Sequence, residues 1–178
     1  AGCSDTAKVT VTAKPNAGVD QTTSCVLSFP GGSVTMAGTG TGSWTAQAGN
    51  PGTSTITTTS SPTTTITTFS AAGIYNYIWT NGSCSDTAKV TVITKPNAGV
   101  DQTVFCASLP GGTATMAGTG TGTWAAQAGN PGTSNITTTN SPTTTITNFS
   151  VSGIYNYIWT NAGCSDTAKV TVTAKPNA

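Results

Sequence analysis

Cysteine and aspartate are the residues of this chain that could carry chemistry, and they recur at a fixed interval. The phrase CSDTAKVTV begins at Cys3, Cys84 and Cys164, and two further cysteines, Cys25 and Cys106, lie outside it. The sequence has no His, Arg or Glu, so general acid–base catalysis would rest on Asp or Lys alone. The aspartates stand in AGVDQT and CSDTAK, in contexts typical of turns and caps. We therefore expect no catalytic residue and no enzyme activity.

The interval between the copies indicates a tandem array of small domains. Residues 31–98 align with residues 111–178 without a gap, at a period of about 80 positions. That period is long enough for one independent domain. CSDTAKVTV is then the last strand of a domain, and KPNAGVDQT contains the linker and the first strand of the next. We expect residues 1–14 to be the last strand of a preceding repeat, and residues 15–95 and 96–178 to be two full repeats.

Alternating apolar and polar residues predict the fold class. GIYNYIWTN places Tyr75, Tyr77 and Trp79 on one strand face, and in DTAKVTV the apolar Ala88, Val90 and Val92 alternate with Thr and Lys. SVTMAG, GSWTAQ, TSTITTT and PTTTITTF add further short strands, separated by Gly, Pro and Asn turns. About seven strands per repeat and no helical period favour an all-β fold of tandem immunoglobulin-like β-sandwiches. We place the aromatic residues in the core rather than on a sugar-binding surface.

Composition excludes several classes of partner and cofactor. The formal net charge is +1, so no electrostatic footprint for nucleic acid is present. No apolar run approaches the ~20 residues of a membrane span, and we expect no membrane insertion. Calcium takes six to eight oxygen ligands, whereas each linker has one nearby acidic residue, Asp20 or Asp101. Because the cysteines also lack close CxxC spacing, we expect neither a metal nor a cofactor.

The cysteines allow two pairing schemes. Within domains, Cys25 would join Cys84 and Cys106 would join Cys164, which leaves Cys3 unpaired in this fragment. Across the linker, Cys3 would join Cys25 and Cys84 would join Cys106. Cys84 precedes a last strand of ~33 Å and should lie far from the linker, while a disulfide needs Cα atoms within about 7 Å. We therefore favour the within-domain pairs, which would stabilise small cores and indicate an oxidising, extracellular compartment.

Two phrases carry a resemblance to a known family. AGVDQT followed by a cysteine, and GIYNYIW followed by a cysteine and DTAKVTV, resemble the PKD-like and Ig-like repeats of Bacteroidetes cell-surface adhesins, including the SprB-like gliding-motility adhesins. The resemblance covers both repeats and the N-terminal overhang. It implies an Ig-like sandwich, export to the cell surface, use in long filaments and no enzyme activity. GTGTGSW replaces the acidic cluster of metal-binding PKD-like relatives, so calcium is not implied.

The DTA motif carries a second resemblance, to the Asp-Ser/Thr-small O-glycosylation signal of exported Bacteroidetes proteins. Its threonines, Thr6, Thr87 and Thr167, are therefore candidate glycosylation sites. Thr87 should face outward, opposite Ala88, Val90 and Val92. The alternative is an ordinary exposed strand threonine, since Thr is a good strand former.

The expected function is that of a structural repeat in a long extracellular filament or adhesin stalk on a bacterial cell surface, serving adhesion or gliding. Its partners would be neighbouring repeats of the same chain and other copies in a filament. The short Lys-Pro linker should limit bending between domains. The alternative is a module that itself binds an external surface, a glycan, ice or a protein partner.

Overall fold

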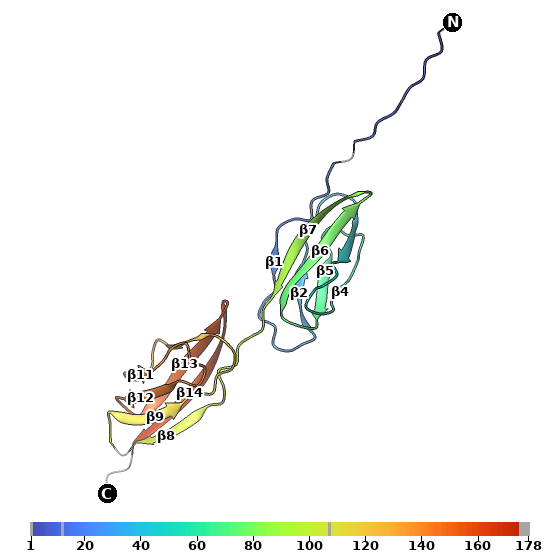
Figure 1. The fold of residues 1–178 in the computed structure, drawn as a ribbon. Helices are drawn as coiled ribbons and strands as arrows, with labels where there is room; N and C mark the ends of the chain where they lie inside the picture. The colour runs from blue at the N-terminus through green and yellow to red at the C-terminus, as the bar shows by residue number, and fades with distance from the viewer. Residues whose placement is uncertain (1, 12, 107, 175–178) are drawn as a thin grey trace. The chain divides into compact units, whose positions relative to one another are not determined.

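The computed structural model describes residues 2–11, 13–106 and 108–174, and it contains two compact units. The first unit is Ala1–Ile93 and the second is Thr94–Ala178. Each unit folds into a β-sandwich (Figure 1). Within the described residues, no helix has the length and hydropathy that a bilayer span requires.

The described residues of the first domain form seven strands, and these match the seven expected sequence phrases. The strands are β1 Gln21–Thr22, β2 Gly31–Thr35, β3 Ser43–Ala46, β4 Thr55–Ile56, β5 Thr65–Phe69, β6 Gly73–Asn81 and β7 Cys84–Val92. One sheet has the order β1-β7-β6-β3 and the other has the order β2-β5-β4. β1 pairs with β7 in parallel, and the other pairs are antiparallel.

The second domain repeats this topology. Its strands are β8 Gln102–Cys106, β9 Gly111–Thr115, β10 Thr123–Ala126, β11 Asn135–Ile136, β12 Thr145–Phe149, β13 Gly153–Asn161 and β14 Cys164–Ala174. The sheets have the orders β10-β13-β14-β8 and β11-β12-β9. β8 is longer than its counterpart β1 and runs parallel to β14 as far as the pair Cys106 and Ala174.

The core lies between the two sheets and is built from the alternating residues. Trp44, Tyr75, Tyr77 and Trp79 are buried, and the rings of Trp44 and Trp79 lie 5.0 Å apart. Aromatic rings bury large apolar areas, which compensates for the low content of other large side chains. The prediction that these residues form the core is confirmed.

The closing strand has the expected register. Ala88, Val90 and Val92 of β7 are buried, whereas Thr87 and Lys89 are exposed. Val9 corresponds to Val90 in the N-terminal copy of CSDTAKVTV. It is 83% exposed, because the described residues of that copy join neither sheet. CSDTAKVTV therefore forms a strand where it pairs with neighbouring strands of a sheet.

A tyrosine corner closes the turn before β6. The hydroxyl of Tyr75 donates a hydrogen bond to the carbonyl oxygen of Ala71 at 3.0 Å, and Tyr155 does the same with Val151. This contact between a tyrosine and the backbone a few residues upstream is a hallmark of immunoglobulin-like sandwiches. The hydrogen bond gives the tyrosine hydroxyl a partner, so burial of the ring leaves no unpaired polar group in the core.

Candidate functional site at the two ends of the repeat

The chain enters the second domain through a contact with the start of β14. The Nζ of Lys95 donates a hydrogen bond to Oδ1 of Asp166 at 2.6 Å, and the backbone N–H of Ala98 donates to Oδ2 at 2.9 Å. Both oxygens of one carboxylate are therefore used by the incoming segment. We call Lys95, Ala98 and Asp166 the lysine–aspartate clamp of this domain, and we call this the leading end of the repeat.

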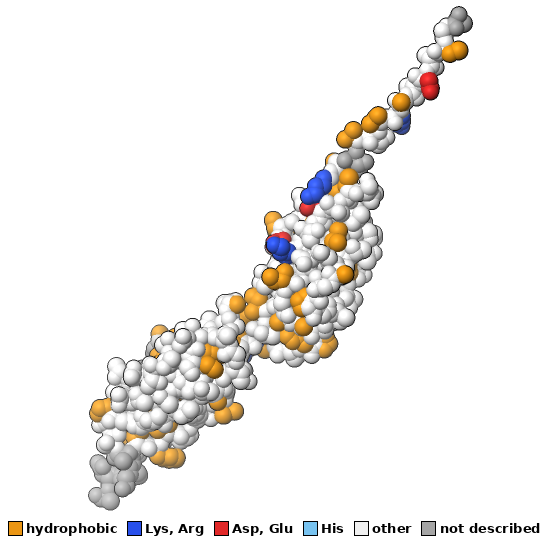
Figure 2. Space-filling view, in the orientation of Figure 1, with side chains coloured by type: hydrophobic (Ala, Val, Ile, Leu, Met, Phe, Trp, Pro, Cys, Tyr) orange, Lys and Arg blue, Asp and Glu red, His pale blue; other side chains and the backbone are white. Residues whose placement is uncertain are grey.

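The first domain has the same clamp, made of Lys14, Ala17 and Asp86. Lys14 Nζ lies 2.6 Å from Asp86 Oδ1, and the N–H of Ala17 donates to Oδ2 at 2.9 Å. Figure 2 shows blue and red side chains in contact on an otherwise mostly uncharged face of the molecule. Because the clamp recurs in both domains, it belongs to the repeat rather than to one position in the chain.

The asparagine of the incoming KPNAG segment shapes its turn. Asn97 Oδ1 accepts a hydrogen bond from the N–H of Gly99 at 2.7 Å, and its carbonyl oxygen accepts one from the N–H of Thr119 at 2.9 Å. Gly99 has φ +85°, and a Cβ at this position would lie 2.6 Å from the carbonyl oxygen of Ala117. A side chain is therefore excluded by both backbone conformation and space.

The clamp lowers the pKa of its aspartates. For Asp86, the largest cause is the hydrogen bond from Lys14, and the N–H of Ala17 adds to it. For Asp166, burial raises the pKa, but the hydrogen bonds from Lys95 and Ala98 outweigh burial, so its pKa is also lowered. Hydrogen bonds to a carboxylate favour its charged form, which keeps the clamp intact at neutral pH.

Asp20 and Asp101 precede the first strand of their domains and bond to the backbone of the last strand. Asp20 Oδ1 accepts a hydrogen bond from the N–H of Lys89, and Asp101 Oδ1 accepts one from the N–H of Lys169, both at 2.9 Å. Lys169 also forms an ion pair with Asp101 at 3.2 Å, and its backbone N–H is the main cause of a lowered Asp101 pKa. Within the described residues, no group of three or more candidate ligands could hold a metal ion.

The chain leaves each domain at the opposite end of the sheet, which we call the trailing end. In the second domain the last strand runs from Cys164 at the leading end to Ala174 at the trailing end. β8 runs beside it in parallel, so Cys106 pairs with Ala174. In the first domain the N–H of Val26 bonds to the carbonyl oxygen of Ile93, which places Cys25 at the trailing end.

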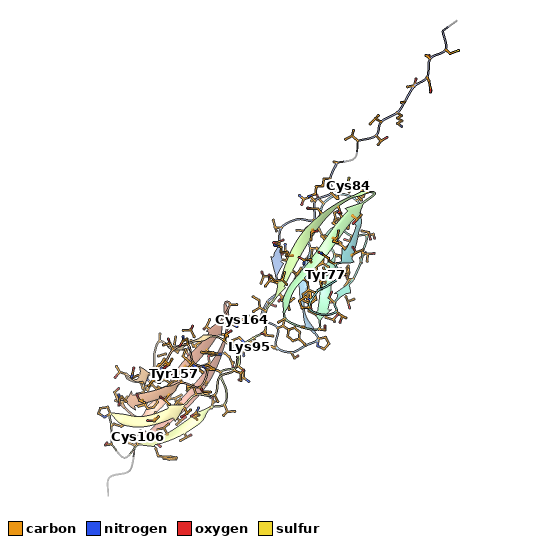
Figure 3. The ribbon with its side chains drawn as sticks, viewed as in Figure 1. Tyr77, Cys84, Lys95, Cys106, Tyr157 and Cys164 are labelled. Carbon is orange, nitrogen blue, oxygen red and sulfur yellow. The ribbon has the colours of Figure 1, made fainter. Side chains whose placement is uncertain are left out.

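The predicted disulfide pairs are wrong. Cys25 and Cys164 are disulfide-bonded, whereas Cys3, Cys84 and Cys106 are free thiols. The physical reason is the parallel pairing of the first and last strands of each domain, which puts the two cysteines of a domain at opposite ends. Ten residues of β14 separate Cys164 from the partner of Cys106, a span of ~33 Å (Figure 3). A disulfide requires about 7 Å or less between Cα atoms.

The candidate glycosylation threonines lie on the surface. Thr87 and Thr167 are exposed on their strands, and Thr6 is exposed in the N-terminal segment. The aspartates that precede Thr87 and Thr167 are occupied by the clamps. The carboxylate of the DTA motif is therefore committed to holding the incoming segment.

A shallow hollow of about 310 Å³ lies beside the loop after β3. Two of its polar side chains are used within the domain. Asn50 bonds through both amide atoms to the backbone of Asn76, and the hydroxyls of Ser54 and Tyr77 lie 2.6 Å apart. The bonds of Asn50 extend the β3–β6 pairing.

The clamp is the feature that sequence reasoning missed. Its lysine and aspartate lie 71 residues apart, too far for any local motif. The available signal was that a lysine before Pro-Asn-Ala-Gly is followed, 72 residues later in the first domain and 71 in the second, by an aspartate after Cys-Ser.

Comparison with known proteins supports the fold. The sequence matches no family model and no curated protein. Immunoglobulin domains 1–4 of Sidekick-1 match in structure with a TM-score of 0.52 and 14% identity, over 92% of this chain and 48% of that chain. Domains 3–5 of Drosophila OTK (TM-score 0.44, 13% identity, 92% and 60% coverage) and the insect protein hemolin (TM-score 0.43, 14%, 95% and 49%) also match. The chain spans about half the length of the Sidekick-1 and hemolin structures. It is an all-β chain of tandem immunoglobulin-like sandwiches.

Proposed function

We propose that the chain is a structural repeat of a long extracellular filament or adhesin stalk on a bacterial cell surface, in which it serves adhesion or gliding. Its repeats would be residues 15–95 and 96–178, and residues 1–14 would be the closing strand of a preceding repeat. The observation that carries the proposal is the path of the chain through each domain. The chain enters beside the start of the last strand and leaves at the end of that strand.

This path makes each domain a spacer. The clamp holds Ala98 beside Asp166, and β14 continues to Ala174 before the chain leaves. Eight residues of extended strand separate the two points, which corresponds to ~26 Å. A domain whose ends lie apart adds length with every copy, whereas a domain with adjacent ends does not.

Tandem immunoglobulin-like domains and disulfide-bonded cysteines support an extracellular location. Disulfides persist in oxidising compartments and are rare in the cytosol. The partners proposed for this chain are neighbouring repeats and other copies in a filament.

Small-angle scattering on chains with two, four and six repeats tests the proposal. We expect the maximum dimension to rise by a constant increment of ~30 Å or more per repeat. A maximum dimension that stays nearly constant would contradict the stalk function. Binding of the two-repeat chain to a glycan array, ice or a protein partner would support a binding module instead.

A further inference from the structure

The hairpin between β6 and β7 contains Asn81 and Gly82, the one Asn-Gly dipeptide in the sequence. Asn81 is the last residue of β6 and pairs with Cys84, the first residue of β7, so Gly82 and Ser83 form a two-residue turn. Hairpin turns of this length favour glycine where φ is positive, and Gly82 has φ +58°. An asparagine therefore stands directly before a glycine at the exposed tip of a hairpin.

The surroundings of this dipeptide are open. Apart from the chain neighbours of Gly82, no heavy atom lies within 4 Å of the position that a Cβ on this residue would occupy. The Asn81 side chain is half-buried, and its Nδ2 donates a hydrogen bond to Oγ1 of Thr41 at 3.4 Å, longer than the usual range for such bonds. The side-chain amide is therefore held weakly.

The second domain has the same hairpin with a different residue after the asparagine. Asn161 ends β13 and pairs with Cys164, but Ala162 follows it in place of glycine. Ala162 has φ +48°, so the residue after the asparagine is left-handed in both turns. Both asparagines are half-buried. The chain thus contains an Asn-Gly and an Asn-Ala dipeptide at equivalent positions of the fold.

We propose that Asn81 is a site of spontaneous deamidation, through which the first domain gains a carboxylate at its leading end. The backbone nitrogen of Gly82 attacks Cγ of Asn81 and closes a succinimide ring. The proton of that nitrogen and the side-chain NH2 group leave together as ammonia. Water then opens the ring at either carbonyl group, which gives aspartate or isoaspartate. Water is the one co-reactant, and no electrons are transferred.

Glycine favours this reaction because the attacking nitrogen must approach the side chain closely. A residue without Cβ reaches backbone conformations that a methyl group excludes, so ring closure is easier before Gly82 than before Ala162. Asn81 has the extended conformation of a strand, in which the nitrogen must first turn toward Cγ. The reaction therefore proceeds when the hairpin tip opens locally, which costs less than unfolding the domain.

Deamidation changes the charge and the backbone of the first domain. The chain has a formal net charge of +1, and one new carboxylate brings this value to zero. A net charge near zero weakens the electrostatic repulsion that keeps molecules apart in solution. Isoaspartate also inserts one methylene group into the main chain where β6 ends at the pair of Asn81 and Cys84. The modification would therefore accumulate with the age of the protein and distinguish old copies from new ones.

Incubation of the folded two-repeat chain at mildly alkaline pH tests the proposal. Trypsin cleaves after Lys8, Lys89 and Lys169 but not at the Lys-Pro bonds, so Asn81 and Asn161 fall in peptides 9–89 and 90–169. Ion exchange separates the deamidated chains, and tandem mass spectrometry of the reduced digest locates the converted residue. We expect conversion at Asn81 to be several-fold faster than at Asn161. Equal rates at the two positions would overturn the proposal.

Reciprocal variants at the turn identify the cause. Gly82→Ala should slow conversion at Asn81 to the rate of Asn161, and Ala162→Gly should raise the rate at Asn161. Ala162 shows that this position accepts an alanine at positive φ, and glycine adopts positive φ freely, so we expect both variants to fold. Circular dichroism checks the fold, and Ala162→Gly carries the test if Gly82→Ala unfolds. An unchanged rate at Asn161 in Ala162→Gly would contradict the proposal.

The proposal does not depend on the stalk function. The conversion rates are measured on a single two-repeat chain, whereas the stalk function is tested by how the maximum dimension rises with repeat number. Failure of one experiment therefore leaves the other result unchanged.

Discussion

The ammonium of Lys95 lies 2.6 Å from the carboxylate of Asp166, across 71 residues of sequence. The equivalent pair of Lys14 and Asp86 has the same length in the first domain. The Lys95 side chain is 35% exposed and the Lys14 side chain is 68% exposed, so the Lys95–Asp166 pair is better shielded from solvent than the Lys14–Asp86 pair. The contact fixes where the chain enters the sandwich, which is the geometry on which the proposed spacer function depends.

Asp166→Asn should destabilise the second domain by up to about 1 kcal/mol. The amide can still accept a hydrogen bond from Ala98, but the charge-assisted bond to Lys95 is lost. Asp5→Asn is the matched control, because Asp5 holds the same motif position and accepts a hydrogen bond from the adjacent N–H of Thr6. Urea unfolding of both variants measures the difference. Equal stabilities of the two variants would show that the clamp contributes nothing.

Acid should weaken the same contacts. The pKa of Asp86 and that of Asp166 are lowered in the folded state, so the unfolded chain binds protons first as the pH falls. Their contribution is present above about pH 4, the ordinary value of an aspartate, and is lost as the pH falls through the lower folded value. Unfolding measured between pH 5 and pH 2 should show this loss, and the Asp86→Asn/Asp166→Asn chain should show a shallower decline. An unchanged slope in that chain would contradict the assignment.

Alkali should act through the buried tyrosines. Burial, partly offset by the hydrogen bond with Ser54, raises the pKa of Tyr77 to about 12, and burial also raises the pKa of Tyr157. The folded domain keeps the proton that the unfolded chain loses near pH 10, so stability is full below pH 10 and falls as the pH rises toward 12. Tyrosinate absorbance should show the buried tyrosines titrating late. Tyr77→Phe/Tyr157→Phe should reduce the alkaline loss of stability, and an unchanged loss would count against this cause.

Val90→Asp should unfold the first domain or reduce its stability by several kcal/mol. Val90 is fully buried, and an unpaired carboxylate there must either lose its charge or leave the core. Val9→Asp is the matched control, since Val9 occupies the same position of the phrase in the exposed N-terminal copy. Circular dichroism during thermal unfolding measures both variants. Similar melting temperatures would overturn the strand register of β7.

Thr87→Ala should leave the fold intact, because the side chain is exposed and a strand position of this kind is worth less than ~1 kcal/mol. If Thr87 carries a sugar, the mass of protein from its native host should fall by one glycan. The Thr91→Ala variant serves as the control, since Thr91 lies on the same strand outside the DTA motif. An unchanged glycan mass in Thr87→Ala would remove this threonine as a glycosylation site.

Local patterns were enough to predict the fold. The seven strand phrases, the inward positions of Val90 and Trp79, and the corner made by Tyr75 follow from alternation and turn residues that lie close together in sequence. These features depend on which face of a strand is apolar, and the alternation of apolar and polar residues within a few positions shows that face. The repeat itself was visible as a period.

Only the tertiary structure decided how the first strand pairs with the last. Sequence patterns do not distinguish a parallel from an antiparallel partner for a short strand such as Gln21–Thr22. Parallel pairing carries Cys25 to the far end of the sheet from Cys84, and this corrected the expected disulfides. It also brings Lys95 to Asp166, whose contact holds the incoming segment beside the start of β14. The position of Cys25 and the Lys95–Asp166 contact both depend on how strands about 70 residues apart in sequence are paired. Strand order and direction are set by the packing of the whole sandwich, so local sequence patterns do not determine them.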